Sequence, residues 1–367
     1  MTQNRNGKKI KVCIVTISLS KGGAERSTAL LSRMLSAENF DVFLVTLNDV
    51  IDYRYSGELI NLGKNKHKED PITSRLYRFI EFRKLIKKEN FDFIIDNRNR
   101  QFALKELFYL KYIYRGNKII YVVRSFKLSQ YFPENKFVRK WMIKKSKGIV
   151  GVSKAIAQSI NKQYHTNKAI NIYNPKEDFS DNNNIVFKEN YILFLGRIEE
   201  AVKNLSLLLD SYKSSILIAH NIHLKILGDG PDKSWLKEKI ILLGLSDFVE
   251  LIPFTPNVYT YLNNAKFLAL TSRYEGFPRV LLESLSTGTP VISVNCKSGP
   301  NEIIAHEVNG LLVENFNIKK LSEAFNRFVL EEDLYLHCKQ NAKKSIDHLS
   351  ADTIAKQWTK YLKDELQ

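Results

Sequence analysis

The chain has 367 residues, of which 44% are hydrophobic and 26% are charged. This length and composition predict a globular protein of two domains, and the apolar runs are strand-length, which excludes a membrane-spanning helix. The net charge of +17 indicates an anionic partner, either nucleic acid, an anionic membrane surface or a phosphorylated substrate. Because no zinc finger, helix-turn-helix or aromatic RNA-binding motif accompanies the charge, the sequence favours the membrane surface over nucleic acid.

The termini and cysteines favour a cytoplasmic setting. The basic N-terminal residues pass directly into a strand pattern, without a signal-peptide cleavage site. The three cysteines, Cys13, Cys296 and Cys338, are too widely spaced for a disulfide framework or a zinc motif. We therefore expect the protein to work in a reducing cytosol.

The first half of the chain alternates strand and helix patterns. Strand patterns cover residues 11–17, 42–47, 91–96, 118–124, 148–152 and 169–173. Helical patterns follow the loop after the first strand through residue 35, and then cover 74–89, 101–114, 136–146 and 154–163. This succession predicts a parallel sheet with right-handed crossovers.

A second series of the same kind follows. The polar, Asn-rich stretch 176–190 is predicted to be a linker. Beyond it, strand patterns cover 191–195, 224–227, 248–252, 267–270, 291–294 and 310–313, and helical patterns cover 203–214, 232–243, 278–286 and 318–330. An amphipathic helix is expected at 350–366. The chain therefore reads as two α/β domains, residues 1–175 and residues 176–349.

Residues 271–302 hold the pattern most indicative of a site. Glu275 lies in a loop before a predicted helix, Gly276-Phe277-Pro278 follows it, and Glu283 lies inside the helix. A helix N-terminus presents unpaired N–H groups, which suit a phosphate or sugar hydroxyls. A carboxylate beside it accepts hydrogen bonds from hydroxyls. The combination predicts a nucleotide-sugar site.

Three further loops are candidate sites, and each has a plainer explanation. Gly22 and Gly23 lie between a strand and a helix, where they allow either close approach of a ligand or a tight turn. Arg197 and Lys203 could clamp a diphosphate or form a solvated surface pair. Gly228-Asp229-Gly230-Pro231 could pack against a nucleoside base or form a simple turn.

No metal site is expected. No two aspartates are separated by a single residue, so the usual acidic pair of a metal–diphosphate site is missing, and the histidines are scattered. Arginine and lysine would then have to neutralise the diphosphate themselves, without a metal or another cofactor.

These motifs resemble those of a known family. They are GGAER at 22–26, GVS at 151–153, YNP at 173–175, GR…K at 196–203, GDGP at 228–231, EGFPRVLLE at 275–283, GTPVI at 288–292 and SGPNEII…NGLLV at 298–313. The chain resembles the retaining glycosyltransferases of family four. The resemblance implies the GT-B fold, in which two Rossmann-like domains face a cleft and the C-terminal helix, here 350–367, packs back on the first domain.

The resemblance also implies roles for the donor-binding residues. Arg197 and Lys203 would bind the donor diphosphate and stabilise its departure, and Glu275 would hold the sugar hydroxyls. The remaining donor-binding positions would be Gly22, Gly23, Gly228, Asp229, Gly276, Phe277, Pro278 and Glu283, with Glu283 accepting from the ribose. Catalysis in this family is ascribed to front-face attack, which needs no protein nucleophile.

One position departs from the family pattern. Many members have a histidine at the end of a strand of the first domain, near the transferred sugar, and this chain has Arg124 and Ser125 there. Arg124 suits a phosphate or an anionic acceptor, so both residues are assigned to the sugar or acceptor side.

The sequence therefore predicts a bacterial glycosyltransferase of lipopolysaccharide or capsule synthesis. Its donor would be a UDP-sugar such as UDP-GlcNAc, UDP-GalNAc or UDP-Glc, and its acceptor a lipid-linked oligosaccharide or a polysaccharide precursor. Alternatives are a GDP-mannose-type donor, a GT-B sugar-nucleotide epimerase, or a basic non-catalytic protein that binds nucleic acid. The basic stretches 74–88 and 136–147 either contact the inner face of the plasma membrane or place their apolar stripes in the core.

Overall fold

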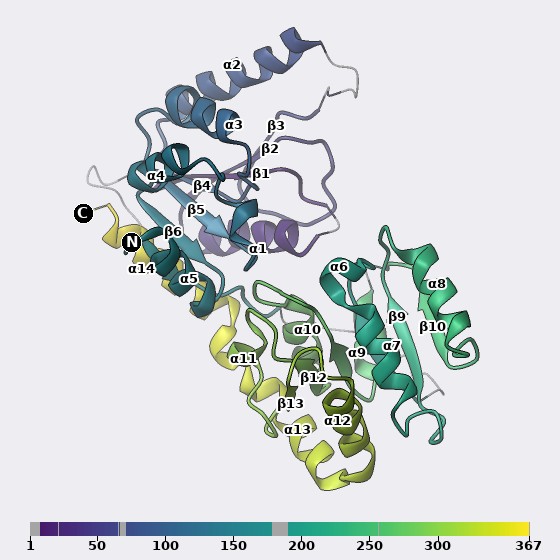
Figure 1. Cartoon of the computed structure of the whole chain (residues 1–367). Coiled ribbons are helices and arrows are strands. Elements are labelled where there is room, and N and C mark those ends of the chain that lie inside the picture. Colours follow the sequence, from purple (N-terminus) through teal and green to yellow (C-terminus); the bar gives the residue numbers. More distant parts are fainter. Residues whose placement is uncertain are drawn as a thin grey trace. The chain divides into compact units, whose positions relative to one another are not determined.

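The computed structural model describes residues 8–20, 22–64, 66, 71–177, 190–255 and 257–366, without the side chains of Ile72 and Arg75. The chain divides into two compact units (Figure 1). Unit 1 comprises Met1–Pro175 and Ala351–Gln367, and unit 2 comprises Lys176–Ser350. Most of the predicted linker at 176–190 lies outside the described residues.

Unit 1 is built on a seven-stranded parallel sheet of order β3-β2-β1-β4-β5-β6-β7. The strands are β1 (Lys11–Thr16), β2 (Asp41–Thr46), β3 (Glu58–Asn61), β4 (Phe93–Asp96), β5 (Ile119–Val123), β6 (Gly148–Gly151) and β7 (Ala169–Asn171). The central strands are runs of Val, Ile and Phe buried on both faces, as expected for a sheet covered by helices on each side.

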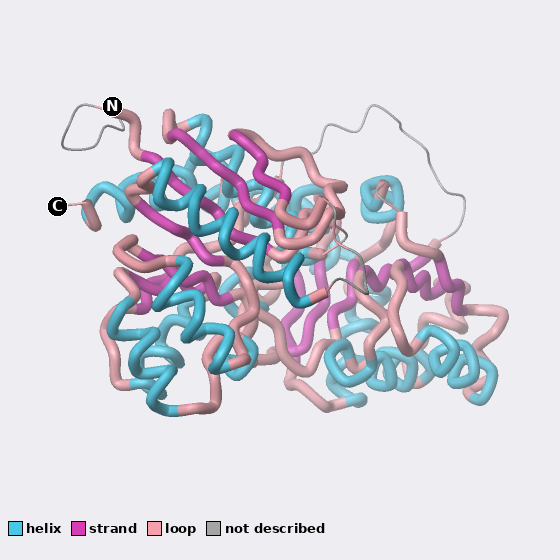
Figure 2. The backbone as a smooth tube through the Cα atoms, turned by 90° about the horizontal axis from the view of Figure 1, so that it is seen from above, coloured by secondary structure: helices cyan, strands magenta, loops and turns pink. Residues whose placement is uncertain are grey.

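The helices of unit 1 cover this sheet, and Figure 2 shows helices flanking the strands. They are α1 (Gly23–Ala37), α2 (Ile72–Glu89), α3 (Ala103–Phe108), the π-helical turn η1 (Tyr109–Ile113), the 3-10 turn η2 (Leu128–Gln130), α4 (Lys136–Lys145), α5 (Lys154–Tyr164) and α14 (Ala351–Asp364). The C-terminal helix α14 packs against α1 and buries Ile354, Trp358 and Leu362 on one face.

Unit 2 repeats the architecture with six parallel strands in the order β10-β9-β8-β11-β12-β13. The strands are β8 (Tyr191–Leu195), β9 (His223–Leu227), β10 (Val249–Ile252), β11 (Leu268–Leu270), β12 (Val291–Val294) and β13 (Gly310–Val313). The helices are α6 (Glu200–Lys203), α7 (Leu205–Lys213), α8 (Lys233–Leu242), α9 (Val258–Asn264), α10 (Arg279–Thr287), α11 (Pro300–Ile303), α12 (Ile318–Leu330), α13 (Glu332–Ser345) and the 3-10 turn η3 (Asp347–Leu349). Phe267, Phe325 and Phe328 pack together in its core.

The predicted fold class, two Rossmann-like domains with parallel sheets, is confirmed. In each unit the strand order reverses once, between β1 and β4 in unit 1 and between β8 and β11 in unit 2. Open parallel sheets bind ligands outside the carboxyl ends of the two strands at such a switch point. The loops after β1, β4, β8 and β11 are therefore where a site is expected. Within the described residues, no helix is both long and apolar enough to cross a bilayer.

Candidate functional site

Lys203 and Glu275 form an ion pair at the switch point of unit 2. Lys203 ends the short helix that follows β8, and Glu275 lies five residues beyond the end of β11. Lys203 Nζ is 2.6 Å from Glu275 Oε1, and the side chains are only 16% and 14% exposed. The Ser272 hydroxyl donates to the same carboxylate oxygen at 2.6 Å. Two opposite charges and a hydroxyl thus meet where the fold binds ligands.

Hydrogen bonds tie the two loops that carry this pair. The Thr271 hydroxyl donates to the Lys203 carbonyl at 2.9 Å, and the Arg273 N–H donates to the Val202 carbonyl at 2.8 Å. The loops are therefore held together by their own backbone, so the pair is positioned before any ligand arrives.

Arg197 lies on the same loop as Lys203 but takes a different partner. Its Nε is 3.2 Å from Glu199 Oε2, and its side chain is 68% exposed. The structure brings Lys203 together with Glu275, whereas the predicted clamp joined Lys203 with Arg197. A role for Arg197 at the diphosphate stays a prediction.

The glycines at 228 and 230 allow two loops to pack backbone to backbone. A Cβ at Gly228 would lie 1.9 Å from the Gly196 carbonyl oxygen, and one at Gly230 would lie 2.0 Å from the Ile198 carbonyl oxygen. Asp229 accepts from Lys233 Nζ at 2.7 Å and from the Phe254 N–H at 3.1 Å. Loop packing thus explains both glycines, and contact of this turn with a nucleoside stays a prediction.

The turn 276–278 is fixed by a second loop. The Ser298 hydroxyl donates to the Gly276 carbonyl at 2.9 Å. Gly299, with a φ of +102°, lies so close that an added Cβ would meet Pro278 Cδ at 2.6 Å. Pro278 is the N-cap of α10, one residue before the helix begins, and Phe277 is buried.

Glu283 is buried inside α10, as predicted for a residue within the helix. The Arg279 guanidinium lies 3.5 Å from Glu283 Oε1 and 2.9 Å from Glu177 Oε2. The Arg279 Nε and Nη1 atoms are buried and find no acceptor among the described residues. The predicted contact of Glu283 with a ribose is not tested by these contacts.

Ser272 and Cys296 belong to the site but were not predicted. Cys296 follows β12 and is 3% exposed. Burial, with the Glu275 carboxylate as a smaller cause, raises the pKa of its thiol to about 12, and Lys203 opposes the shift. Ser272 follows β11, a strand at the switch point, so the switch-point rule could have indicated it, whereas Cys296 follows β12, which is not one of the two switch-point strands.

The glycine loop of unit 1 lies at the start of α1. Gly22 is the N-cap of this helix and Gly23 its first residue. A Cβ at Gly22 would lie 2.0 Å from Glu25 Oε2, so Gly22 leaves room for the Glu25 carboxyl to fold back over the loop. Burial raises the pKa of Glu25, and the nearby charge of Arg124 opposes this shift.

Arg124 follows β5 and is held by two asparagines. Its Nε and Nη2 donate to Asn97 Oδ1 at 3.2 and 3.0 Å, and its Nη1 donates to Asn174 Oδ1 at 2.8 Å. The Ser125 hydroxyl oxygen accepts from the Lys127 N–H at 3.2 Å. Neither asparagine was predicted as a site residue, although Asn174 lies in the YNP motif.

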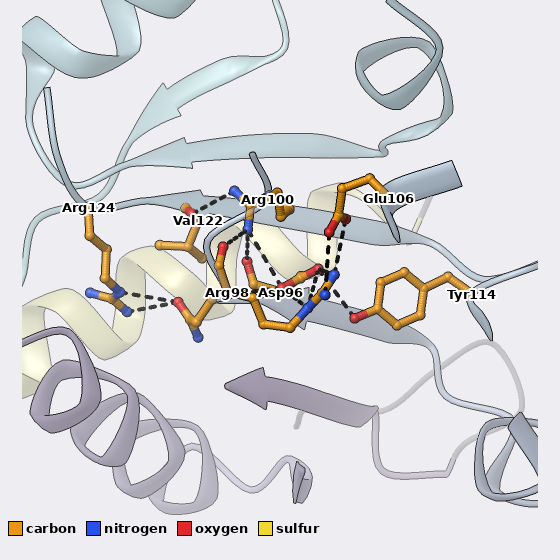
Figure 3. A network of polar contacts seen from close by, with 8 residues as sticks. Asp96, Arg98, Arg100, Glu106, Tyr114, Val122 and Arg124 are labelled. Carbon is orange, nitrogen blue, oxygen red and sulfur yellow. Dashed lines mark hydrogen bonds and ion pairs between the residues drawn. The ribbon is translucent and has the colours of Figure 1, made fainter. Parts of the chain in front are cut away.

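A buried charge network lies beside this arginine (Figure 3). The Arg98 guanidinium is fully buried and lies 2.7 Å from Asp96 Oδ2 and 3.1 Å from Glu106 Oε2. Its Cζ stacks 3.6 Å from the centre of the Tyr109 ring. In the part of the chain that the structure describes, no three His, Cys, Asp or Glu side chains gather as a metal-binding group.

Two family models match consecutive parts of the chain. The model for Glycosyltransferase Family 4 matches residues 21–175, and the model for Glycosyl transferases group 1 matches residues 175–345. The first therefore falls on unit 1 and the second on unit 2, including Lys203, Glu275 and Glu283.

Similar proteins cover the chain nearly end to end. An N-acetylgalactosamine-N,N'-diacetylbacillosaminyl-diphospho-undecaprenol 4-alpha-N-acetylgalactosaminyltransferase of Campylobacter jejuni is 29% identical, over 96% of this chain and 99% of its own length. The amylovoran biosynthesis glycosyltransferase AmsD of Erwinia amylovora is 26% identical over the same shares. Staphylococcus aureus TarM, solved with fondaparinux, alpha-GlcNAc-glycerol and UDP, has a TM-score of 0.77 at 14% identity, and covers 96% of this chain and 99% of its own. The chain belongs to the group 1 glycosyltransferases of the family-four type, enzymes with the GT-B fold.

Proposed function

We propose that the chain is a retaining glycosyltransferase that uses a UDP-sugar and acts on a lipid-linked oligosaccharide or a surface-polysaccharide precursor. The donor sugar would be GlcNAc, GalNAc or Glc. The observation that carries the proposal is the Lys203–Glu275 pair at the switch point of unit 2.

The pair offers the two interactions that a sugar diphosphate requires. The Glu275 carboxylate accepts hydrogen bonds from sugar hydroxyls. The Lys203 ammonium offsets the negative charge that grows on the diphosphate as the bond to the anomeric carbon breaks. Because the two groups are 2.6 Å apart, a donor whose sugar binds Glu275 brings its diphosphate within reach of Lys203. Lysine then supplies the charge that a metal ion supplies elsewhere, and Arg197 can add to it from its exposed position on the same loop.

The relatives support the donor class and the stereochemistry. TarM was solved with UDP and with alpha-GlcNAc-glycerol, and the Campylobacter relative is named for an α-linked transfer onto a diphospho-undecaprenol acceptor. UDP-linked GlcNAc, GalNAc and Glc are themselves α-linked, so an α-linked product corresponds to retention. In the proposed reaction the acceptor hydroxyl attacks from the face that the diphosphate leaves, and a diphosphate oxygen takes the proton.

The donor is tested by thermal shift and hydrolysis with UDP-GlcNAc, UDP-GalNAc, UDP-Glc and GDP-mannose. We expect one UDP-sugar to raise the unfolding temperature and to be hydrolysed slowly. Absence of any response to all four would refute the proposed function, and a response to GDP-mannose alone would replace the donor. Conversion of the donor to an epimer without acceptor would identify an epimerase instead.

We also propose that unit 1 meets its lipid-linked acceptor at an anionic membrane surface. In each of the two predicted basic helices, some apolar side chains lie in the core and others lie on the surface. Phe82 and Met142 are fully buried, whereas Tyr77 on α2 and Phe137 on α4 are 61% and 86% exposed. Exposed aromatic side chains among many cations are typical of helices that lie on a bilayer.

A further inference from the structure

The short helix that carries Lys203 cannot hold its own position. α6 consists of the four residues Glu200–Lys203, and Asn204 ends it in a left-handed conformation with a φ of +51°. A single helical turn is not stable alone, because it has too few hydrogen bonds to offset the lost backbone entropy. The lysine side chain adds a flexible four-carbon stem. The place of Lys203 Nζ against Glu275 therefore depends on the contacts that neighbouring loops make with α6.

These contacts converge on Glu200, the first residue of α6. Its N–H donates to Asp232 Oδ2 at 2.7 Å. Its Oε2 accepts from the Ser206 N–H, in the first turn of α7, at 3.1 Å. Its Oε1 lies 2.9 Å from Arg273 Nη2. Both carboxylate oxygens are thus engaged, and three separate segments of unit 2 are tied to the start of α6.

Arg273 joins α6 to the loop that carries Glu275. Besides the contact with the Glu200 carboxylate, its Nε donates to the Glu200 carbonyl at 3.4 Å. Its own N–H donates to the Val202 carbonyl at 2.8 Å. Its Cζ lies 5.7 Å from the centre of the Phe316 ring. Because Glu275 is only two residues further along the same loop, Arg273 sets the distance between the two segments that carry the ion pair.

The contact between Arg273 and Glu200 is too exposed to contribute much to folding. Their side chains are 35% and 22% exposed, and ion pairs near the surface add little to the free energy of unfolding. A reacting geometry is more demanding, since a displacement of about 1 Å lowers a rate by about a hundredfold. A change at this contact should therefore affect kcat more than the unfolding temperature.

We infer that Arg273 and Glu200 are positioning residues, which hold Lys203 Nζ where it meets Glu275 and the donor diphosphate. The inference rests on the proposed function, because it assigns both residues to the same site. In this role neither residue contacts the donor, and each acts through Lys203. The rival role for Arg273 is that of a direct diphosphate ligand, for which Glu200 would compete with the diphosphate.

The test compares Arg273→Met in the otherwise wild-type chain and in a Lys203→Ala background. A positioning residue has no effect once the group that it positions is removed, whereas a direct ligand is lost equally in both chains. Arg273→Lys keeps a cation for the Glu200 carboxylate, so it should lose less activity than Arg273→Met. The readout is kcat with the UDP-sugar to which the wild type responds.

A second variant and a control complete the set. Glu200→Gln has a single acceptor oxygen, so its side chain cannot accept from both Arg273 and the Ser206 N–H. If Arg273 were a direct ligand, this change would release it and raise activity. Arg327→Met is the matched control, because Arg327 is also 35% exposed and pairs on α12 with two carboxylates, those of Glu307 and Glu331.

We expect Arg273→Met and Glu200→Gln each to lower kcat by about tenfold or more, at a nearly native unfolding temperature, and Arg327→Met to keep wild-type kcat. In the Lys203→Ala background, Arg273→Met should lower kcat by less than about twofold. Wild-type kcat in Arg273→Met, an equal loss in the Lys203→Ala background, or a gain of activity in Glu200→Gln would each overturn the inference. Loss of the native thermal transition in both variants would also overturn it, because the contact would then be structural.

Binding of inorganic pyrophosphate separates this inference from the proposed function, because it needs no turnover. By titration calorimetry on the full chain, Arg273→Met should weaken binding by about tenfold and leave the residual binding of Lys203→Ala unchanged. If the wild type turns over no sugar nucleotide but this pattern holds, the proposed function fails and the positioning role stands. With an inactive wild type, pyrophosphate binding that is absent or unaffected by Arg273→Met would overturn the positioning role as well.

Discussion

Lys203 and Glu275 form one largely buried ion pair, so a change in either leaves the other charge without this partner. We expect Lys203→Ala and Glu275→Ala each to reduce kcat by about 10²–10³, the usual loss when one preorganised partner of a transition-state charge is removed. Because the two residues act as a unit, the fold-reduction in kcat of the double variant should be much smaller than the product of the fold-reductions in the two single variants. Steady-state kinetics of the two single variants and the double variant, with the UDP-sugar to which the wild type responds, measure these losses.

The control for this pair is Lys239→Ala, which breaks a surface pair with Asp210 in the same unit. It should keep wild-type kinetics. Full activity in both Lys203→Ala and Glu275→Ala would refute the assignment of the site, and an unfolding temperature near that of the wild type would show that the loss of activity is not a loss of fold.

Glu25 makes the stability of unit 1 depend on pH. Burial raises its pKa above 4.5 in the folded state, and this outweighs the attraction of Arg124. Protonated Glu25 contributes stability to the folded state. This contribution is complete at pH values below the pKa of Glu25 in the unfolded chain, and it is lost as the pH rises through the higher pKa of Glu25 in the folded protein. Glu25→Gln should therefore have a larger free energy of unfolding than the wild type at about pH 7, and the gain should disappear below about pH 4. Urea unfolding across this range measures it, with the exposed Glu58→Gln as the control.

At the scale of elements, the network of Arg98 and Glu106 joins the end of β4 to α3. The two side chains are 0% and 1% exposed. Arg98→Met removes one cation and leaves the Asp96 and Glu106 carboxylates buried, which should cost about 3–5 kcal/mol of unfolding free energy. The double variant Arg98→Met/Glu106→Gln removes one charge of each sign, so it should be more stable than Arg98→Met alone. Urea unfolding measures the loss of unfolding free energy in each variant. A coupled network would be contradicted if Arg98→Met and the double variant lost the same amount, or if the losses of the two single changes simply added in the double variant.

The elements themselves follow closely from the sequence. Buried parallel strands are continuous runs of Val, Ile and Leu, and the predictions for β8, β12 and β13 match the structure residue for residue. The short strand β3 was not predicted, because its four residues are partly exposed and carry no such run. The predicted helix 101–114 is α-helical only from Ala103 to Phe108 and continues as the π-helical turn η1, whose first residue, Tyr109, lies against Arg98.

The contacts that make the sites could not be predicted in the same way. Helical or strand periodicity relates residues only a few positions apart. Lys203 and Glu275 are 72 positions apart, and Asn97 and Arg124 are 27 apart. Each residue could be recognised as polar and near a strand end, but which ones pair depends on the strand order, which places β8 beside β11 and β4 beside β5.

At the scale of the whole molecule, the structure shows that cations behind the net charge of +17 lie on unit 1. The α4 segment, KFVRKWMIKKSK at 136–147, has six cations and no carboxylate. Its neighbour α3 packs on it, and α2 packs on the η1 turn that follows α3. We call these elements the basic apolar face, and their exposed large apolar side chains are Leu76, Tyr77, Phe102, Leu104, Tyr112 and Phe137. Cations near an anionic surface contribute about 1 kcal/mol each, and inserted apolar side chains add to this.

The membrane proposal predicts that this face binds vesicles containing phosphatidylglycerol and does not bind pure phosphatidylcholine. Phe137→Ser and Leu104→Ser, at side chains that are 86% and 83% exposed, should each weaken co-sedimentation by about tenfold, since burying a large apolar side chain is worth about 1.5–3 kcal/mol. Leu330→Ser in unit 2, at a side chain that is 67% exposed, is the matched control and should bind as the wild type does. Raising the salt concentration to about 1 M should weaken vesicle binding by the wild type, because it shortens the Debye screening length to about 3 Å. If all three variants sediment equally with the vesicles, the cations act without the apolar side chains and this face is not the membrane contact.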